Sequence, residues 1–376
     1  MRVAFNATPL IFPASGVAQY ARGLAQALLQ RNDVECLFFY GYGWSGELRR
    51  SAVPGTHRLK SVLLKLLPRP EAVVRGVQQW FFRGVERLAC RVYHEPNFFP
   101  FASGLPTVTT VHDLAPIRFP DTYTSQSRRK WQTLLPGALS RSQLILTDSE
   151  FIRSELLTLF DIDPGKVRAI PLGVNPEYHV LPDVALAQGL ARYGLQSRRY
   201  LLSVGTIEPR KNLLTTLEAC RGLPIEAARE FPLIIVGGRG WLTRGIDEAI
   251  QSLQREGRAR YLGYVRQEDM PVLYGGAKML LYPSLYEGFG FPPLEAMACG
   301  SPVITSNRAS LPEVVGSAGV QVEPTNVEAL KAAILALLSA TDRWNALRAA
   351  GLARAREFSW QRCAESTLAA YRAVNR

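Results

Sequence analysis

The sequence predicts an α/β fold made of two doubly wound parallel sheets, and three observations lead to this expectation. Short apolar runs rich in Val, Ile and Leu alternate with longer segments of helical period, which is the pattern of β-α-β units around buried parallel strands. The chain has 376 residues, more than one hydrophobic core usually holds, so we expect two domains with a cleft between them. Hydrophobic residues make up 47% and charged residues 20%, as in ordinary folded proteins.

The apolar runs place the strands of each sheet in order along the chain. In the first half they are residues 3–8, 34–40, 91–94, 107–112 and 144–148, and in the second half residues 200–204, 233–236, 261–262, 279–282 and 303–305. Pro171, Pro176 and Pro182 interrupt a stretch without helical period, so the division between the domains is expected at residues 173–185. The predicted domains are residues 1–175 and 176–359. A helical tail follows at 360–376, and its spacing leaves open whether it packs back on the first domain.

Cysteine usage and the start of the chain indicate a cytoplasmic protein. The five cysteines are odd in number, widely spread and form no C-x-x-C pair or Cys/His cluster, as expected in a reducing compartment. Met1 leads directly into an expected strand, with no room for the charged and apolar regions of a signal peptide. No apolar run approaches the roughly 18 residues of a membrane-spanning helix, so any contact with a membrane is expected to be peripheral.

The charge of the chain points to anionic partners. The net charge is +12 and the pI is near 9.7, which suits nucleic acid, an acidic lipid surface or phosphorylated substrates. Residues 57–91 concentrate basic residues and interleave them with leucines and with Trp80, Phe81 and Phe82. Basic and aromatic residues together favour a surface that lies on an anionic membrane. In the alternative interpretation, the leucines and rings pack the core of the first domain and the arginines are solvated.

The strongest motif, YEGFGFPPLEAMACG at residues 286–300, follows the fourth strand expected in the second half. Gly288 and Gly290 allow the backbone to approach a ligand closely, and the N-terminus of the helix that follows attracts phosphate. Glu287 before the turn and Glu295 on the helix supply carboxylates, which accept hydrogen bonds from sugar hydroxyls. In the alternative interpretation the glycines only form a turn and both carboxylates are solvated, because a lone G-x-G is common.

A second motif, VGTIEPRKN at residues 204–212, joins a strand end, a turn and a helix start. Arg210 and Lys211 are adjacent cations at this turn. They are suited to neutralise a diphosphate leaving group, on which negative charge grows as a glycosidic bond breaks. An isolated pair of this kind would more often be solvated. The position at the carboxyl end of a parallel strand, where α/β sheets bind ligands, favours the functional interpretation.

Two further candidates lie in the first domain. Gly16 follows Ser15 where a helix begins, so the N–H groups there can face phosphate or sugar, although Ser15 also serves as an ordinary helix N-cap. His112 ends a strand on the same edge of the sheet, either as a ligand contact or as a structural histidine. The stretch Tyr93-His94-Glu95-Pro96, at the end of the preceding strand, is a weaker candidate for contact with an acceptor. Dinucleotide, P-loop, zinc-protease and nucleophile-elbow motifs are absent from the sequence.

The string from Glu287 to Glu295 and onward, G-F-G-x-P-x-L-E-A-M-A, resembles the hallmark of family 4 retaining glycosyltransferases. The resemblance continues through residues 263–265, 302–304 and 311–316. It implies a GT-B fold of two facing Rossmann-like domains, with an acceptor bound by the first domain and a nucleotide-sugar donor bound by the second. It also implies that Glu287 contacts the donor sugar and that Glu295 contacts the ribose.

The same resemblance implies roles for the other candidates. The implied catalytic residues are His112, Glu287, Arg210 and Lys211. The implied substrate-binding residues are Gly16, Tyr264, Val265, Gly288, Phe289, Gly290 and Glu295. Lys211 matches the lysine of the family's diphosphate-binding element. Many members have an arginine five residues before that lysine, where this chain has Thr206, and Arg210 is the candidate to replace it.

The resemblance implies transfer with retention of the anomeric configuration, without a metal or another cofactor. The G-T-x-E-P-R-K-N string favours mannose from GDP-mannose, and UDP-glucose, UDP-N-acetylglucosamine and deoxysugar donors remain open. The expected acceptor is a hydroxyl of a glycan or lipid-linked glycan in polysaccharide biosynthesis, at the inner face of the cytoplasmic membrane. Two alternatives remain, a nucleotide-sugar epimerase of similar architecture and a nucleic-acid-binding protein. For the second the sequence has no recognised motif, so nucleic acid is not an expected partner.

Overall fold

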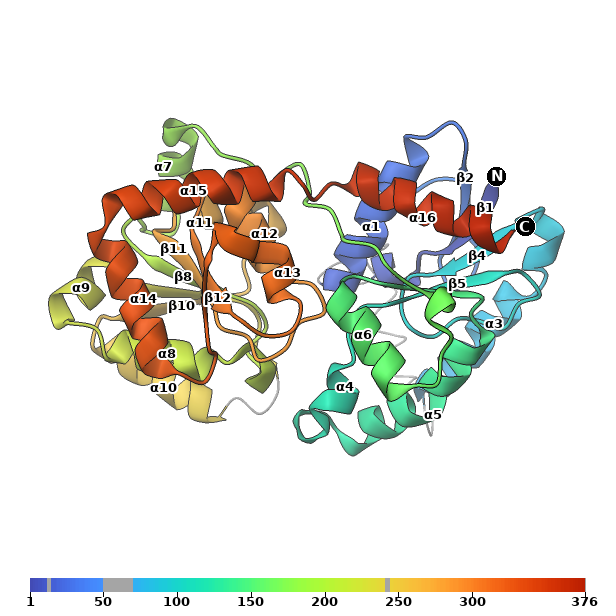
Figure 1. Ribbon diagram of the computed structural model, residues 1–376, viewed down its shortest axis with the longest axis horizontal. Coiled ribbons are helices and arrows are strands. Elements are labelled where there is room, and N and C mark those ends of the chain that lie inside the picture. The colour runs from blue at the N-terminus through green and yellow to red at the C-terminus, as the bar shows by residue number, and fades with distance from the viewer. Residues whose placement is uncertain (12–14, 50–69, 241–243, 376) are drawn as a thin grey trace. The chain divides into compact units, whose positions relative to one another are not determined.

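The computed structural model describes residues 1–11, 15–49, 70–240 and 244–375, and the chain forms two compact units (Figure 1). Unit 1 contains Met1–Leu114, Ser125–Gly173 and Trp360–Arg376. Unit 2 contains Ala115–Thr124 and Val174–Ser359. The sequence predicts domain boundaries between residues 175 and 176 and between residues 359 and 360. In the structure the boundaries follow Gly173 and Ser359. The segment Ala115–Thr124, which the sequence analysis assigned to the first domain, groups with unit 2.

Within the described residues, unit 1 is built on a seven-stranded sheet with the order β3-β2-β1-β4-β5-β6-β7. The strands are β1 (Arg2–Asn6), β2 (Glu35–Phe39), β3 (Trp44–Ser45), β4 (Val92–Glu95), β5 (Thr107–Val111), β6 (Leu144–Thr147) and β7 (Val167–Ala169). Neighbouring strands are parallel except β3, which is antiparallel to β2. Every residue of β4, β5 and β6 is buried, because helices cover both faces of the sheet.

Two of the helices of unit 1 begin at a serine whose side chain caps them. The helices of this unit are α1 (Gly16–Leu29), α3 (Pro70–Phe82), α5 (Ser125–Arg141), α6 (Glu150–Leu159) and α16 (Trp360–Val374), with short 3-10 turns η1 (Thr8–Ile11), η2 (Val85–Leu88) and η4 (Pro164–Lys166). The Ser15 hydroxyl accepts a hydrogen bond from Ala18 N at the start of α1. Ser149 caps α6 in the same way through Ile152 N. Each cap satisfies a backbone donor that the helix leaves unpaired.

The tail helix α16 packs against α1 within unit 1 (Figure 1). A Cβ atom at Gly23 would lie 2.2 Å from the Trp360 ring, so the close approach of these helices requires glycine at that position. The Tyr371 hydroxyl lies 2.5 Å from Nδ1 of His94, and burial lowers the pKa of this histidine to about 3. His94, the weaker candidate for acceptor contact, is therefore a neutral core residue that holds the tail.

In the part of unit 2 that the structure describes, a six-stranded sheet has the order β10-β9-β8-β11-β12-β13. Its strands are β8 (Leu201–Val204), β9 (Leu233–Val236), β10 (Ala259–Gly263), β11 (Met279–Tyr282), β12 (Val303–Ser306) and β13 (Val320–Val322), all parallel to their neighbours. The core around β8, β9 and β11 consists of leucine, isoleucine, valine and methionine side chains that are almost fully buried. These residues form the apolar runs from which the strands were predicted.

Helices lie between consecutive strands of unit 2 and cover the sheet (Figure 1). Those between strands are α8 (Leu213–Arg221), α9 (Ile225–Glu230), α10 (Arg244–Arg255), α11 (Met270–Gly276), α12 (Phe291–Ala298) and α13 (Leu311–Val315). Unit 2 also contains α4 (Ala115–Arg118), α7 (Asp183–Ala191) before β8, and α14 (Val327–Ser339) and α15 (Thr341–Ala355) after β13. Short 3-10 turns are η3 (Pro120–Thr122), η5 (Pro209–Lys211), η6 (Gln267–Asp269) and η7 (Gly316–Ala318). The alternation of strand and helix confirms the predicted α/β class.

All ten strands expected from the sequence are present, and their ends differ from the prediction by at most two residues. The sequence analysis did not include β3, β7 and β13. Each of these strands is only two or three residues long, which is too short to show an apolar run. The prediction therefore found the central strands of both sheets and the edge strand β10, and it missed the three other edge strands.

Candidate active site

The order of the strands in unit 2 reverses between β8 and β11, because β9 lies beside β8 on one side and β12 lies beside β11 on the other. Open α/β sheets bind ligands at the carboxyl ends of strands at such a switch point. The two strongest sequence motifs directly follow these two strands. The fold therefore brings Lys211 and Glu287, which are 76 residues apart in the sequence, to one place.

The turn after β8 has a fixed conformation. Pro209 begins the 3-10 turn η5, and Asn212 ends it with a φ of +56°, a left-handed conformation that asparagine tolerates better than most residues. The Asn212 side-chain amide donates to Pro283 O at 2.9 Å and to Pro324 O at 2.7 Å. These hydrogen bonds hold the turn against the ends of β11 and β13. They thereby orient the two residues before Asn212, which are Arg210 and Lys211.

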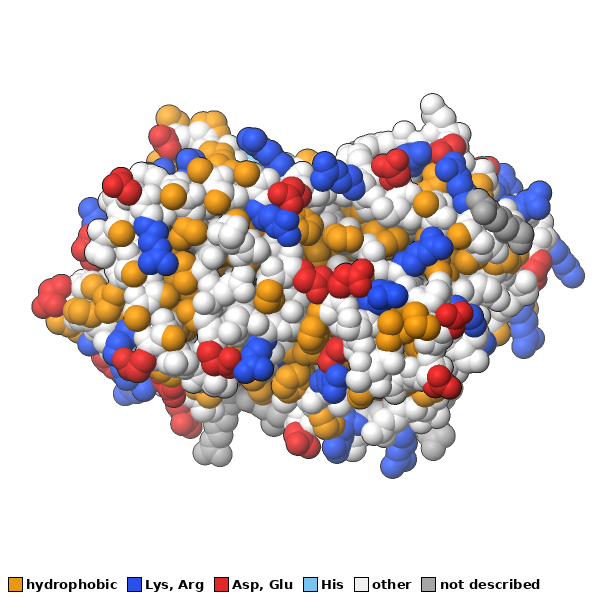
Figure 2. Space-filling model, in the orientation of Figure 1, with side chains coloured by type: hydrophobic (Ala, Val, Ile, Leu, Met, Phe, Trp, Pro, Cys, Tyr) orange, Lys and Arg blue, Asp and Glu red, His pale blue; other side chains and the backbone are white. Residues whose placement is uncertain are grey.

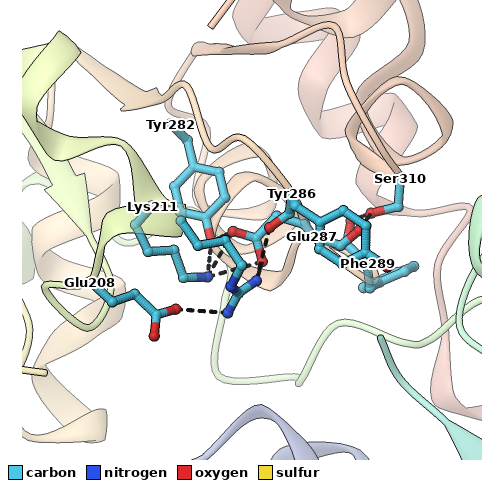
Figure 3. Close-up of polar contacts among 8 residues, drawn as sticks. Glu208, Lys211, Tyr282, Tyr286, Glu287, Phe289 and Ser310 are labelled. Carbon is cyan, nitrogen blue, oxygen red and sulfur yellow. Dashed lines mark hydrogen bonds and ion pairs between the residues drawn. The ribbon is translucent and has the colours of Figure 1, made fainter. Parts of the chain in front are cut away.

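Glu287 accepts hydrogen bonds from both cations (Figure 3). Lys211 Nζ donates to Glu287 Oε1 at 2.7 Å and to Oε2 at 2.9 Å, and Arg210 Nη1 donates to Oε2 at 3.1 Å. The Tyr282 hydroxyl donates to Oε1 at 2.8 Å. Arg210 Nη2 in turn donates to Glu208 Oε1 at 2.8 Å. The two cations and the two carboxylates are largely buried, and their formal charges cancel.

The charges of this cluster depend on one another. Burial alone would raise the pKa of Glu287, but Lys211 and Arg210 outweigh this effect and lower the pKa to about 2. Glu287 is therefore ionised at neutral pH. Burial lowers the pKa of Lys211, while the charge of Glu287 acts in the opposite direction. Each ion thus compensates the cost of removing the other from water.

The loop after β11 is supported by Ser310, which is fully buried. The Ser310 hydroxyl oxygen lies 2.9 Å from Glu287 O and 2.7 Å from Phe289 O, so one O–H group bridges two carbonyls of the loop (Figure 3). Gly290 has a φ of +124°, a conformation that favours glycine, and α12 begins immediately after it. The loop backbone is thereby held beside the charged cluster.

The helix that follows differs in one respect from the expectation. Pro292 and Pro293 occupy the first turn of α12 and have no N–H group, so this helix end offers fewer phosphate donors than the sequence analysis assumed. The Phe289 side chain is buried against the rings of Phe291 and Phe358. At Phe289 the backbone, and not the ring, is therefore the part of the residue suited to ligand contact.

The loops after β8 and β9 touch through glycines. A Cβ atom at Gly237 would lie 1.9 Å from Gly205 O, and Gly237 also has a φ of +147°. Gly205, Thr206, Lys211 and Tyr282 line a small cavity at this place. Thr206 itself is exposed, and the guanidinium beside Glu287 belongs to Arg210. That Arg210 replaces the arginine which many family members have at position 206 stays a prediction.

The other candidates of unit 2 lie apart from the charged cluster. Tyr264 and Val265 follow β10, two strand positions from β8, and Tyr264 is 68% exposed whereas Val265 is buried. Glu295 is buried on α12, where Oε2 accepts a hydrogen bond from the Tyr274 hydroxyl at 2.8 Å. Glu287 and Glu295 thus have different partners, although the same short motif contains both.

The two candidates of unit 1, His112 and Gly16, differ in their surroundings. His112 Nδ1 lies 2.8 Å from Asp148 Oδ2, and Nε2 lies 2.7 Å from Pro96 O. Burial alone would lower the pKa of His112, but the charge and hydrogen bond of Asp148 outweigh it and raise this pKa. Both ring nitrogens are thus engaged inside unit 1, as in a structural histidine. Gly16 is exposed at the start of α1, next to its N-cap Ser15.

Several side chains of the site were not candidates in the sequence analysis. Tyr282, Ser310 and Glu208 are bound to the charged cluster or to its loop. Glu208 lies within the motif at 204–212 and Tyr282 at the end of β11, so the positions around each strand end could have indicated them. Ser310 is 23 residues beyond Glu287, and no local pattern marks it.

Within the described residues, no group of three or more His, Cys, Asp or Glu side chains is suited to hold a metal ion, and no helix is long and apolar enough to cross a membrane. All five cysteines are buried and free. On the face that Figure 2 shows, Lys and Arg side chains are interspersed with Asp and Glu and form no continuous basic tract. The expectation of a reaction without metal stays a prediction.

Two family descriptions match the chain. "Glycosyltransferase Family 4" matches residues 14–178 and "Glycosyl transferases group 1" matches residues 192–354. The chain is 35% identical to O-antigen chain mannosyltransferase B of Escherichia coli over 99% of this chain and 100% of the relative. It is 30% identical to the serotype-specific mannosyltransferase WbdA of Escherichia coli over 68% of this chain and 32% of that protein.

Solved structures share the fold of the whole chain. A sucrose-phosphate synthase from Thermosynechococcus elongatus has a TM-score of 0.77 at 20% identity, covering 100% of this chain and 99% of that one. WaaG, a glycosyltransferase involved in lipopolysaccharide biosynthesis, has a TM-score of 0.71 at 18% identity, covering 97% and 98%. Two Rossmann-like sheets with a charged cluster at a switch point thus define a GT-B glycosyltransferase. The chain belongs to the family 4 glycosyltransferases, which confirms the resemblance found in the sequence.

Proposed function

We propose that this chain is a mannosyltransferase of polysaccharide assembly, which transfers mannose from GDP-mannose to a hydroxyl of a glycan or lipid-linked glycan. The observation that carries the proposal is the 35% identity, over essentially all of both chains, to a protein named for O-antigen chain mannosyl transfer. A second relative, at 30% identity, is also named as a mannosyltransferase. We further propose that the transfer retains the anomeric configuration and requires no metal ion.

In this proposal the donor diphosphate lies at the carboxyl ends of β8 and β11. Lys211 and Arg210 neutralise the charge that grows on the diphosphate as the bond to the sugar breaks. Glu287 and Glu208 already orient these two cations, so little reorganisation accompanies the reaction. The ionised carboxylate of Glu287 is suited to accept a hydrogen bond from a hydroxyl of the donor sugar.

A panel of nucleotide sugars tests the donor. GDP-mannose is expected to raise the unfolding temperature of the protein more than UDP-glucose or UDP-N-acetylglucosamine, because a ligand that binds the folded state stabilises it. Transfer from GDP-mannose to a mannoside is expected to give the α-anomer by NMR, at equal rates with and without EDTA. Stabilisation by uridine nucleotides alone would contradict the donor, and conversion of the donor sugar without acceptor would indicate an epimerase.

We also propose that unit 1 binds an anionic membrane through the exposed face of α3. Residues 57–69 of the predicted basic segment lie outside the described residues. In the described part, apolar side chains at helical spacing are exposed along α3, and the arginines just after it are also exposed. They are Val73, Val77, Trp80 and Phe81, followed by Arg83 and Arg87. Phe82, by contrast, is fully buried in the core of unit 1, as the alternative interpretation expected of such rings.

Co-sedimentation with vesicles tests this surface. The protein is expected to pellet with vesicles that contain anionic lipid at low salt and to be released at high salt. The double substitution Trp80→Ala and Phe81→Ala is expected to weaken this binding, whereas Val184→Ala, an exposed apolar residue of unit 2, serves as the control. Equal recovery in the supernatant with anionic and neutral vesicles would contradict membrane binding and favour a soluble acceptor.

A further inference from the structure

The order of the strands in unit 1 reverses between β1 and β4, so their carboxyl ends flank a second switch point. β1 ends at Asn6 and β4 ends at Glu95, and Asn6 Nδ2 donates to Glu95 Oε2 at 2.7 Å. The Tyr93 hydroxyl donates to the same oxygen at 2.7 Å. Residues 96–100, which we name the β4 loop, continue the chain from this point. The loop contains none of the residues assigned above to donor binding.

Hydrogen bonds from several elements of unit 1 fix the backbone of the β4 loop. They join Asn97 N to Glu95 Oε1 (3.0 Å), Pro96 O to His112 Nε2 (2.7 Å), Phe98 N to Thr110 O (3.0 Å) and Phe99 O to Arg75 Nη2 (2.7 Å). A loop that only connects two strands does not require so many hydrogen bonds to its surroundings, since connecting loops are usually variable and mobile. The bonds therefore indicate that the conformation of this loop matters.

The backbone conformation that these hydrogen bonds hold in the β4 loop is strained. Phe98 has a φ of +59°, which is unusual for a residue with a large side chain. Phe99 N donates to Asn97 O at 2.6 Å and closes a tight turn around Phe98. Residues in such sparsely populated regions are strained and cluster at functional sites. A strained and rigid loop thus lies at the edge of the sheet where ligands of this fold bind.

The strained conformation determines which aromatic side chain of the β4 loop is buried and which is partly exposed. Phe98 is buried, with its ring 4.6 Å from that of Trp131 and 5.5 Å from that of His112. The next ring, Phe99, is only half-buried and lies 5.4 Å from Trp131, which is also half-buried. Asn97, whose side chain is an amide, is half-buried beside them. Two planar apolar rings and an amide therefore lie together at the carboxyl edge of unit 1.

This combination matches the chemistry of a pyranose ring. One face of a pyranose carries C–H groups, whose positive edges are attracted to the electron-rich face of an aromatic ring. Its hydroxyl groups both donate and accept hydrogen bonds, and an asparagine amide can do the same. A nucleotide diphosphate requires several cations, as in the charged cluster of unit 2. Beside the rings of the β4 loop, one cation is near, since Lys130 Nζ lies 5.9 Å from the centroid of the Phe99 ring.

From this juxtaposition we propose that the β4 loop and Trp131 form the subsite for the terminal sugar of the acceptor. Trp131 stacks on the face of the pyranose ring, and Phe99, whose ring is inclined at 75° to that of Trp131, packs against its edge. The Asn97 amide binds one of the sugar hydroxyls. Glu95 is a positioning residue, because it holds the backbone N–H of Asn97. The ligand class rests on the proposed function, since a glycosyltransferase must hold an acceptor hydroxyl in place.

Kinetics with an α-linked mannobiose acceptor test the subsite. Trp131→Ala and Phe99→Ala are each expected to raise the acceptor KM about tenfold, a factor that corresponds to about 1.4 kcal/mol. The KM of the donor and the thermal shift caused by GDP-mannose are expected to stay unchanged. Trp131→Phe keeps an aromatic face and is expected to restore most of the acceptor affinity. Leu134→Ala, an exposed apolar position on the same helix, is the matched control.

A second measurement is independent of transfer. Titration of the protein with mannobiose, without donor, is expected to change the tryptophan fluorescence in a saturable way, and Trp131→Phe is expected to abolish this change. Unchanged acceptor KM in folded Trp131→Ala and Phe99→Ala variants would overturn the subsite. If Trp131→Ala does not fold, Phe99→Ala and Trp131→Phe decide the question. Absence of transfer from any nucleotide sugar would refute the proposed function, whereas the titration would still decide the subsite.

Discussion

Replacement of Glu287 by glutamine tests the charged cluster directly, because it removes one negative charge and leaves the side chain nearly the same size. This carboxylate is the shared partner of Lys211 and Arg210 and also accepts a hydrogen bond from Tyr282. Glu287→Gln therefore leaves two largely buried cations without their common counter-charge. Breaking a buried ion pair by removing one partner costs about 3 to 5 kcal/mol.

The pKa of Glu287 supplies a second magnitude. Its fall from the ordinary 4.5 to about 2 in the folded protein corresponds to about 3 kcal/mol, because each pKa unit is worth roughly 1.4 kcal/mol. Because the pKa is lower in the folded state, this stabilisation is fully present above about pH 4.5. It is lost as the pH falls from about 4.5 toward about 2. Both arguments thus predict that Glu287→Gln lowers the free energy of unfolding by at least about 3 kcal/mol at pH 7.

Urea unfolding of the wild type, Glu287→Gln and Glu226→Gln checks this expectation. Glu226 is exposed on α9, so its substitution is expected to change the free energy of unfolding by less than about 0.5 kcal/mol. At pH 7 Glu287→Gln is expected to be less stable than the wild type by about 3 kcal/mol, and this difference should narrow at about pH 4. The variant should also lose transfer activity. A difference below about 1 kcal/mol at pH 7 would refute a buried, ionised Glu287.

Three other substitutions test separate parts of the structure. Lys211→Ala is expected to lower kcat more than donor affinity in steady-state kinetics, because its charge acts on charge that grows toward the transition state, and an equal loss of both would contradict this role. Gly237→Ala is expected to cost about 1 to 3 kcal/mol in denaturant unfolding, since the new Cβ would overlap Gly205 O, and an unchanged midpoint would contradict it. Tyr371→Phe removes the partner of buried His94 Nδ1 and is expected to cost about 1 to 3 kcal/mol by thermal unfolding. Wild-type stability in that variant would mean that the bond does not hold the tail helix.

The sequence by itself determined the fold class, the central strands and the position of the main site. Parallel strands covered on both faces need uninterrupted apolar runs, and such runs are visible without any knowledge of pairing. Ligands of this architecture bind where strands end, so the residues after the runs at 201–204 and 279–282 were candidates from the start. Arg210, Lys211 and Glu287 were named for this reason, and the structure places them in contact.

Only the tertiary structure decided which of these residues meet. Glu287 and Glu295 are eight positions apart, yet the chain turns between them, and Glu295 binds Tyr274 instead of the charged cluster. Ser310 supports the loop from another helix, and the strain of Phe98 arises from bonds to strands and helices elsewhere in unit 1. Spacing along the chain describes which face of one element a residue occupies. Contacts between elements depend on strand order and on close packing in three dimensions, which no local pattern contains.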